Sequence, residues 1–155
     1  MFLILFSFMH YKRKSLSHAI PHWVADGAEY FITVCTVPRG RNQLCHLNTW
    51  SLIKESILFR QDRGDWWICL LLLMPDHLHA IMSFSPEIGM KDTMNHWKRY
   101  TCKNGNIQWQ RDFFDHRLRA NESYMEKAHY IRMNPVRAGL IERPEDWRYI
   151  WENRT

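Results

Sequence analysis

The 155-residue sequence contains four cysteines but no CxxC pair, because Cys35, Cys45, Cys69 and Cys102 are widely separated. A zinc knuckle or a disulfide framework needs closely patterned cysteines, so neither is expected. Free thiols of this kind fit a reducing cytoplasm. The chain also has no internal repeat and no low-complexity tract. At this length we expect one compact domain with one functional site.

The sequence also lacks an apolar run long enough to cross a bilayer. The N-terminal run MFLILFSFM is short and is followed, not preceded, by basic residues. It is therefore too short to span a membrane and has the wrong order for a secretion signal. We expect residues 1–14 to be an extension outside the fold and residues 15–155 to form a single domain. No stable membrane association is expected.

Positive charge and aromatic residues are plentiful. Lys and Arg number 21 against 16 acidic residues, giving a net charge of +5, and aromatic residues make up 14% of the chain. This balance favours a polyanionic partner. Aromatic side chains beside basic ones can stack on unpaired bases, although each can equally pack in a core.

Hydrophobic periodicity and turn residues divide the chain into strands and helices. Aromatic and β-branched residues predict a strand over 30–37, and the unbroken apolar run over 66–74 is typical of a strand buried on both faces. We expect a second central strand over 77–84, an extended segment over 107–118, and helices over about 48–61, 90–104 and 124–133. This order predicts an α+β fold in which helices cover an antiparallel sheet.

Two histidines separated by one leucine, His77-Leu78-His79, lie within the strand expected over 77–84. Side chains alternate between the faces of a strand, so both imidazoles point to the same side, about 7 Å apart at their Cα atoms. That spacing suits two ligands of one metal ion, while Leu78 faces the core. Two ordinary strand histidines remain the alternative interpretation.

Tyr130 and Asn134 occur near the end of the last expected helix. Positions four residues apart share a helix face, so both side chains can project toward one point. A phenol there could attack phosphorus, helped by a divalent cation because tyrosine is a weak nucleophile at neutral pH. The alternative is that Tyr130 packs in the core and Asn134 caps the helix before Pro135.

Two blocks of the sequence resemble those of the REP-associated tyrosine transposases, which belong to the HUH nuclease superfamily. Met74–His79 (MPDHLH) is similar to their MPNHxH block, and Tyr130–Leu140 (YIRMNPVRAGL) is similar to their YIxxNPVRAGL block. The resemblance extends over roughly residues 15–150 and implies a ferredoxin-like antiparallel sheet with helices packed on it.

The resemblance also implies a reaction. His77 and His79 would bind a divalent metal ion, Mg²⁺ or Mn²⁺, with Asn134 as a third ligand, and Tyr130 would be the nucleophile. The tyrosine would attack the scissile phosphate of single-stranded DNA, form a covalent 5′-phosphotyrosine and release a 3′-hydroxyl for rejoining. The alternative is a domesticated protein that binds hairpin DNA without cutting it.

The family recognises DNA hairpins with a flanking single strand, so cations and aromatic residues near the motifs are candidates for DNA contact. These candidates are Lys91, Trp97, Lys98, Arg99, Lys103, Trp109, Arg111, Arg117, Arg119, Arg132 and Arg137. His116 matches the family pattern but receives no chemical role. The sequence leaves open whether the protein acts as a monomer or a homodimer, and so whether Tyr130 meets the histidines of its own chain.

Two residues need separate expectations. Asp76 stands where many relatives have asparagine, and strand alternation predicts that its side chain faces away from the histidines. Tyr124 lies six residues before Tyr130, about 240° around a helix, and is expected to be structural.

Overall fold

The computed structural model describes residues 21–119, 122 and 124–153, and the expected N-terminal extension over 1–14 lies outside them. These residues form one five-stranded antiparallel sheet with the strand order β4-β1-β3-β2-β5. The strands are β1 (Tyr30–Cys35), β2 (Trp66–Met74), β3 (His77–Phe84), β4 (Phe114–Arg117) and β5 (Ile150–Glu152). Helix α2 connects β1 to β2 and helix α3 connects β3 to β4, so two interleaved β-α-β units give the expected ferredoxin-like α+β fold.

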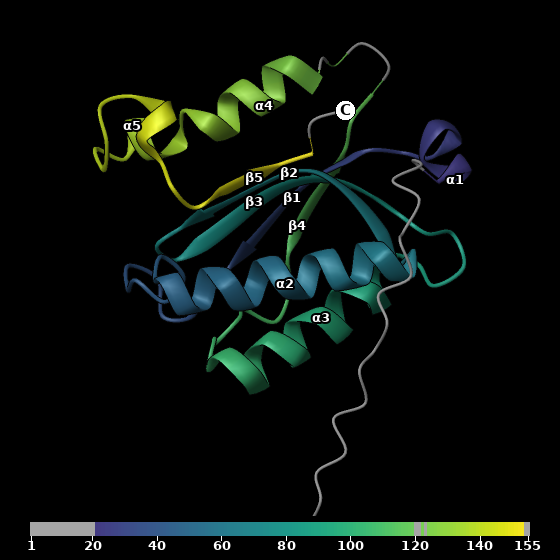
Figure 1. Ribbon diagram of the computed structural model, residues 1–155, viewed down its shortest axis with the longest axis horizontal. Coiled ribbons are helices and arrows are strands. Elements are labelled where there is room, and N and C mark those ends of the chain that lie inside the picture. The colour runs from purple at the N-terminus through teal and green to yellow at the C-terminus, as the bar shows by residue number, and fades with distance from the viewer. Residues whose placement is uncertain (1–20, 120–121, 123, 154–155) are drawn as a thin grey trace, which may run out of the picture.

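The helices lie on opposite faces of this sheet (Figure 1). Helices α2 (Leu47–Arg63) and α3 (Met90–Gly105) cover one face, and α4 (Tyr124–Arg132) and α5 (Asn134–Arg137) lie over the other. A short α1 (His22–Asp26) precedes β1, and a 3₁₀ turn, η1 (Pro144–Asp146), precedes β5. Among the described residues, no helix is long and apolar enough to span a membrane.

The larger hydrophobic core lies between the sheet and the α2/α3 layer. Strand residues such as Ile32, Leu71 and Leu78 point into it, and α2 and α3 add Ile53 and Trp97. Trp97 is only 2% exposed, and its indole N–H donates to the Ser56 hydroxyl, so its one polar atom is satisfied in the core. This layer holds most of the apolar burial on which the fold depends.

The core under α4 is smaller. It contains Leu70, Leu72, Met74 and Ile81 from the sheet, covered by Ala128 and Ile131 of α4. Alternate residues of β2 therefore face two different cores. This confirms the prediction from its unbroken apolar sequence that β2 is buried on both faces.

Most predicted elements are present, with shifts at their ends. β2 and β3 have the expected bounds, β1 ends at Cys35, two residues early, and α2 begins at Leu47, one residue before its expected start. The last predicted helix, over 124–133, is confirmed as α4 (Tyr124–Arg132), and a separate short helix, α5, follows it. Pro135 has no N–H to donate to the Ile131 carbonyl, so α4 stops and α5 begins with Pro135 in its first turn.

Candidate active site

The two histidines of β3 point to the face that α4 covers. Leu78, between them, is 2% exposed and packs in the opposite core, as strand alternation predicts. The rings of His77 and His79 lie 4.8 Å apart between centroids, at an interplanar angle of 79°. The two imidazoles are therefore close enough to act on one group.

Each histidine is held through its Nδ1 atom. His79 Nδ1 lies 2.9 Å from the hydroxyl of Thr33, its antiparallel partner on β1, and His77 Nδ1 lies 2.8 Å from a carboxylate oxygen of Asp76. No hydrogen bond from a described residue reaches either Nε2 atom. If both Nδ1 atoms carry the proton, each Nε2 lone pair faces outward, free for a cation.

Burial adds to this arrangement at His79. Burial, followed by the charges of His77, Arg137 and Arg39, lowers the pKa of His79 to about 3. His79 is 6% exposed, and the ring of Phe31 stacks on it at 5.3 Å. The imidazole is therefore neutral at ordinary pH, which is the form that binds metals.

Asp76 contacts His77, contrary to the expectation from alternation that its side chain faces away from both histidines. It lies in the tight turn between β2 and β3, where alternation does not apply. Its carboxylate accepts hydrogen bonds from Arg39 Nε at 2.9 Å and from the Gly40 amide at 2.8 Å, besides its contact with His77. Partial burial raises the pKa of Asp76, but the bonds from Gly40 and His77 and the charge of Arg39 outweigh it and lower the pKa. Asp76 is thus an ionised anchor for His77.

Tyr130, on α4, faces the histidines across the same surface. Its ring centroid lies 6.3 Å from that of His79 and 6.1 Å from that of Phe31. The side chain is 49% exposed, so solvent or a ligand can reach it. One chain therefore brings together His77, His79 and Tyr130, which lie far apart in the sequence.

Arg137 of α5 holds Tyr130 from the other side. Its guanidinium carbon lies 4.3 Å from the centre of the Tyr130 ring, and its Nη2 donates to the Tyr130 carbonyl at 2.7 Å. A continuing helix would offer that carbonyl to the amide of Asn134. The break before α5 leaves it to Arg137 instead, so the end of α4 and the tyrosine ring are fixed by one side chain.

Asn134 does not share a helix with Tyr130. The chain bends at Met133, and Asn134 is the first residue of α5. The structure gives the Asn134 side chain no hydrogen bond to a described residue. Within the described ranges, no group of three or more His, Cys, Asp or Glu residues is placed to hold a metal ion. The role of Asn134 as a third ligand stays a prediction.

The donor set nevertheless fits a divalent cation in part. Two imidazoles held through their Nδ1 atoms can bind Mn²⁺ or a similar ion through Nε2, and Asp76 supplies the carboxylate that commonly supports a ligating histidine. The remaining positions would need oxygen atoms from Asn134, water or a phosphate group. A site open on that side suits a ligand that brings its own oxygens.

Tyr124 is placed differently from Tyr130. Its hydroxyl lies 3.5 Å from Glu152 of β5, and it packs against the smaller core. Burial, followed by the negative charge of Glu152, raises the pKa of Tyr124 to about 12. Its phenol is therefore a poorer nucleophile than an unperturbed one, consistent with a structural role.

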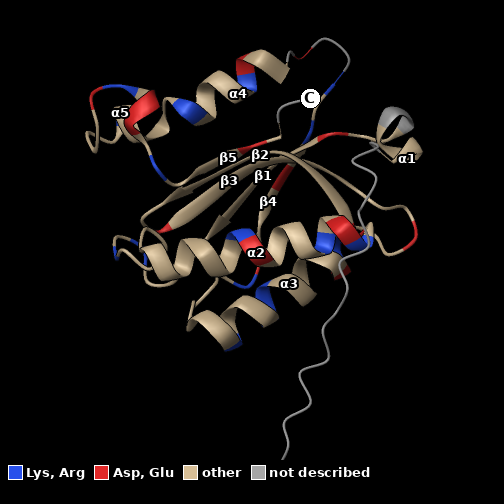
Figure 2. Cartoon of the chain, viewed as in Figure 1, with Lys and Arg blue, Asp and Glu red and all other residues tan. Residues whose placement is uncertain are grey.

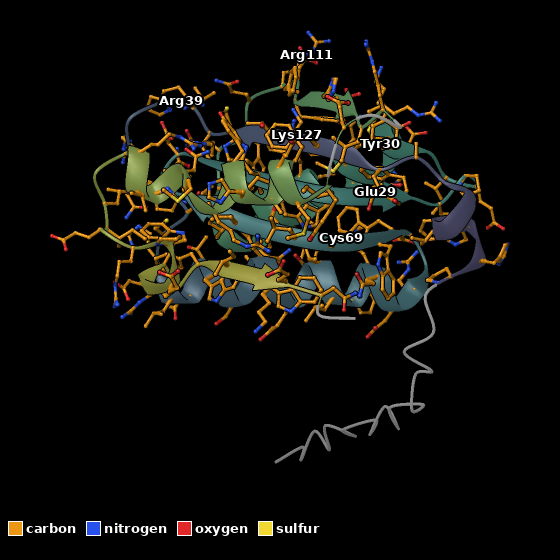
Figure 3. The ribbon with its side chains drawn as sticks, turned by 90° about the horizontal axis from the view of Figure 1, so that it is seen from above. Glu29, Tyr30, Arg39, Cys69, Arg111 and Lys127 are labelled. Carbon is orange, nitrogen blue, oxygen red and sulfur yellow. The ribbon has the colours of Figure 1, made fainter. Side chains whose placement is uncertain are left out.

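The four cysteines are all free thiols. Burial raises the pKa of Cys45 to about 12 and that of Cys69 to about 12, with Glu29 adding to the shift at Cys69. Figure 3 shows Cys69 and Glu29 beneath the α4 side of the protein, where the thiol lies 3.6 Å from the Glu29 carboxylate. Neither buried thiol is suited to nucleophilic chemistry.

Three residues expected to contact DNA are packed inside the protein. Trp97 belongs to the core, and Trp109 is half-buried with its indole N–H donated to Thr101 at 2.8 Å. Lys98 is 8% exposed, and its ammonium donates to the carbonyls of Gln110 and Arg111. Their side chains are occupied in holding α3 to the segment before β4. Trp97 and Lys98 therefore have packing roles. Trp109 is only partly buried, but its indole N–H is also engaged within the protein.

The other predicted cations divide between the two faces of the sheet. Lys91, Arg99 and Lys103 are exposed on α3, which lies on the opposite face of the sheet from Tyr130. Figure 2 shows Lys and Arg on helices of both layers, so net charge alone marks no single DNA-binding face. Arg132 and Arg137 belong to α4 and α5, on the histidine side, whereas Arg111, Arg117 and Arg119 are exposed around β4. Arg117 pairs with Tyr30, whose side chain packs in the α2/α3 core, so alternation points Arg117 to that opposite face. Arg111 lies at the outer edge of the sheet in Figure 3.

Arg132 and His116 each have a carboxylate partner within the protein. Arg132 forms an ion pair with Glu152 of β5 and so ties α4 to the sheet. His116 Nε2 lies 3.0 Å from both carboxylate oxygens of Glu122, which also accepts the Arg119 amide. His116, which received no role from the sequence, thus orders the chain after β4.

No local sequence pattern singled out Thr33 and Phe31, which contact His79, or Phe114, which contacts Phe31. Thr33 and Phe31 belong to β1 and reach His79 only through the register of β1 with β3. Phe114 reaches Phe31 through the register of β1 with β4. A single sequence does not encode these registers visibly, so no local pattern could have found them.

Comparison with known proteins places this geometry in context. The chain is 30% identical over 129 residues to the REP-associated tyrosine transposase of Escherichia coli K12, an alignment that spans 79% of this chain and 75% of that protein. A solved structure of a REP-associated tyrosine transposase bound to a REP hairpin superposes with a TM-score of 0.68, at 23% identity, over 80% of this chain and 76% of that one. No family model matches the sequence.

Proposed function

The chain belongs to the family of REP-associated tyrosine transposases and is a DNA-processing enzyme, and from this we propose that it cuts and rejoins single-stranded DNA with Tyr130 as its nucleophile. The observation that carries the proposal is the approach of Tyr130 to the histidine pair, 6.3 Å from the His79 ring. Tyr130 is half exposed, while the competing Tyr124 is tied to Glu152.

In the proposed reaction, the Tyr130 oxygen attacks the scissile phosphorus as its proton is lost. The bond from phosphorus to the 3′ oxygen breaks, and that oxygen takes up a proton as the leaving 3′-hydroxyl. The 5′ phosphate stays joined to Tyr130, and attack by a 3′-hydroxyl in the reverse sense rejoins the strand. Each step exchanges one phosphoester for another, so no external energy source is needed.

The residues around Tyr130 would contribute by orientation. Arg137 stacks on the phenol ring and binds the carbonyl of the same residue, which limits the directions the hydroxyl can take. Its guanidinium also supplies positive charge beside the position of a bound phosphate. Phe31 packs against both His79 and Tyr130 and so would limit how far their two rings can move relative to each other.

His77 and His79 would hold a divalent ion through their Nε2 atoms, with Asn134 as a further candidate ligand. The ion would polarise the phosphate and stabilise charge developing on it. Thr33 and Asp76 fix the imidazole rings for this task. A hairpin with a flanking single strand is the proposed substrate, supported by the hairpin bound to the structural relative.

Tyr130 and the histidines of the same chain face each other, which supports catalysis within one chain. Mixing Tyr130→Phe with His79→Ala protein tests this. If each site is built from one chain, the mixture stays inactive. Activity restored by mixing would instead show that two chains exchange Tyr130.

The central experiment incubates the protein with a pool of labelled hairpin oligonucleotides carrying single-stranded flanks, in Mn²⁺ or in EDTA. Denaturing gels should show a covalent protein–DNA band in Mn²⁺ only. Tyr130→Phe should abolish the band, and the matched variant Tyr124→Phe should keep it. Hairpin binding without a band from the wild type would support a non-catalytic DNA-binding protein and contradict the proposal.

A further inference from the structure

Aromatic side chains exposed on the α4 face of the sheet are few. Among the described residues, the strongly exposed aromatic ones are Phe59 on α2, Tyr100 on α3, Phe114 on β4 and Tyr130 on α4. Phe59 and Tyr100 belong to the opposite layer. Phe114, at 57% exposure, is therefore the aromatic side chain left open beside Tyr130. A single exposed apolar ring is common on a protein surface, so its position relative to the candidate active site decides whether it has a role.

The sheet places Phe114 on the histidine side. Phe114 is the antiparallel partner of Thr33, whose hydroxyl holds His79, so the two side chains leave the sheet on one face. The Phe114 ring lies 6.3 Å from Phe31 at an interplanar angle of 71°. Phe31 in turn contacts both His79 and Tyr130, so a single ring separates Phe114 from the candidate active site.

The surroundings of Phe114 suit a nucleic acid strand. β4 is an edge strand of four residues, and no strand among the described residues pairs with its outer side. Arg111 and Arg119 are exposed just before and just after it, while Arg117 alternates to the opposite face of the sheet from Phe114. Cations that attract a phosphate backbone beside an exposed aromatic ring form the usual combination for binding unpaired bases. Trp97 and Trp109, the aromatic residues that the sequence suggested for this task, are packed against α3 instead.

We propose that Phe114 stacks on an unpaired base of the single-stranded flank and thereby positions the neighbouring phosphate at Tyr130. This inference rests on the proposed function. Stacking on a π face is tolerant of base identity, so Phe114 would fix the path of the strand more than its sequence. Phe114 is a positioning residue in this role because it does not touch the reacting atoms.

The test combines protein variants with abasic oligonucleotides. Equilibrium binding is measured by fluorescence anisotropy in EDTA, where cleavage is not expected, using hairpins whose unpaired flank carries one abasic nucleotide at each position in turn. Phe114→Ala is compared with Phe114→Trp and with the matched control Phe59→Ala, which removes an equally exposed ring from the other layer. Circular dichroism confirms that each variant is folded.

Phe114→Ala should weaken binding of the intact flank by about 5- to 150-fold, while Phe114→Trp and Phe59→Ala stay within about twofold of the wild type. At one flank position, abasic substitution should weaken binding by the wild type but not by Phe114→Ala, which identifies the stacked base. If every abasic position weakens both proteins equally, or if Phe114→Ala binds like the wild type, stacking is overturned while the proposed function stands. If the wild type binds no hairpin, the proposed function fails as well.

Discussion

The two faces of the sheet are built on different principles. The face under α2 and α3 buries fifteen hydrophobic residues, including Trp66 and Trp97. The face under α4 buries six and relies also on polar contacts such as the Arg132–Glu152 ion pair. The histidines, Tyr130 and Phe114 all belong to the second face. One layer therefore supplies most of the stability, which allows the other to expose aromatic and charged groups.

The largest effect should come from breaking the stable face. Trp97→Ala removes a fully buried ring together with the hydrogen bond that its indole N–H donates to Ser56, so we expect the free energy of unfolding to fall by about 3–5 kcal/mol. Urea denaturation followed by circular dichroism measures this. Phe59→Ala, an exposed change on the same layer, should cost less than about 0.5 kcal/mol. Similar small losses for both would contradict the assignment of the main core to this layer.

Sequence patterns predicted this stable face well, because it depends on local periodicity. The unbroken apolar run of β2 implied burial on two faces, and both cores use it. Met90, Met94 and Trp97 recur at helical spacing and share one face of α3. That spacing is typical of core positions, so it predicts the burial of Trp97 and argues against base stacking by this residue.

The candidate site was only partly predictable. His77, His79 and Tyr130 could be selected from their motifs, and alternation correctly put Leu78 in the core. The contact of Asp76 with His77 depends on turn geometry, and that of Thr33 with His79 on strand register. Strand β5, whose Glu152 pairs with Arg132, has only three residues, too few for a recognisable hydrophobic pattern. Long-range pairing determines the contacts of Thr33 and Arg132, and the conformation of the turn determines that of Asp76.

A second, smaller effect should appear at the support of the histidines. Asp76→Ala removes the carboxylate that holds His77 Nδ1, so we expect affinity for Mn²⁺ to fall by about 10- to 100-fold. Asp76→Asn keeps an acceptor for His77 and should lose less. Isothermal titration of the DNA-free protein measures both. Asp62→Ala, an exposed change on α2, serves as the control, and a loss equal to that of Asp76→Ala would show that charge alone is responsible.

Arg137→Lys sharpens the comparison by keeping the charge on the α4 face while removing the planar group. Lysine cannot stack on the Tyr130 ring and bind its carbonyl together, so the tyrosine should lose its fixed orientation. We expect the single-turnover rate of adduct formation to fall about two- to fivefold, with little change in DNA affinity. A loss confined to affinity would mean that Arg137 contacts DNA instead. Arg143→Lys, whose partner is Asp146, is the matched control.

The smallest effect should come from loosening α4 itself. Glu152→Gln removes the charge that pairs with Arg132, and because both side chains are more than a quarter exposed, the loss of global stability should stay below about 1 kcal/mol. Hydrogen exchange should nevertheless accelerate in the amides of α4, since Ala128 and Ile131 are the only residues it buries, while α2 and α3 keep their protection. Glu142→Gln, an exposed carboxylate without a described ion-pair partner, should change neither. If exchange rose equally in all helices, the two faces would unfold as one unit, and α4 could not adjust its position over the histidines independently of the core.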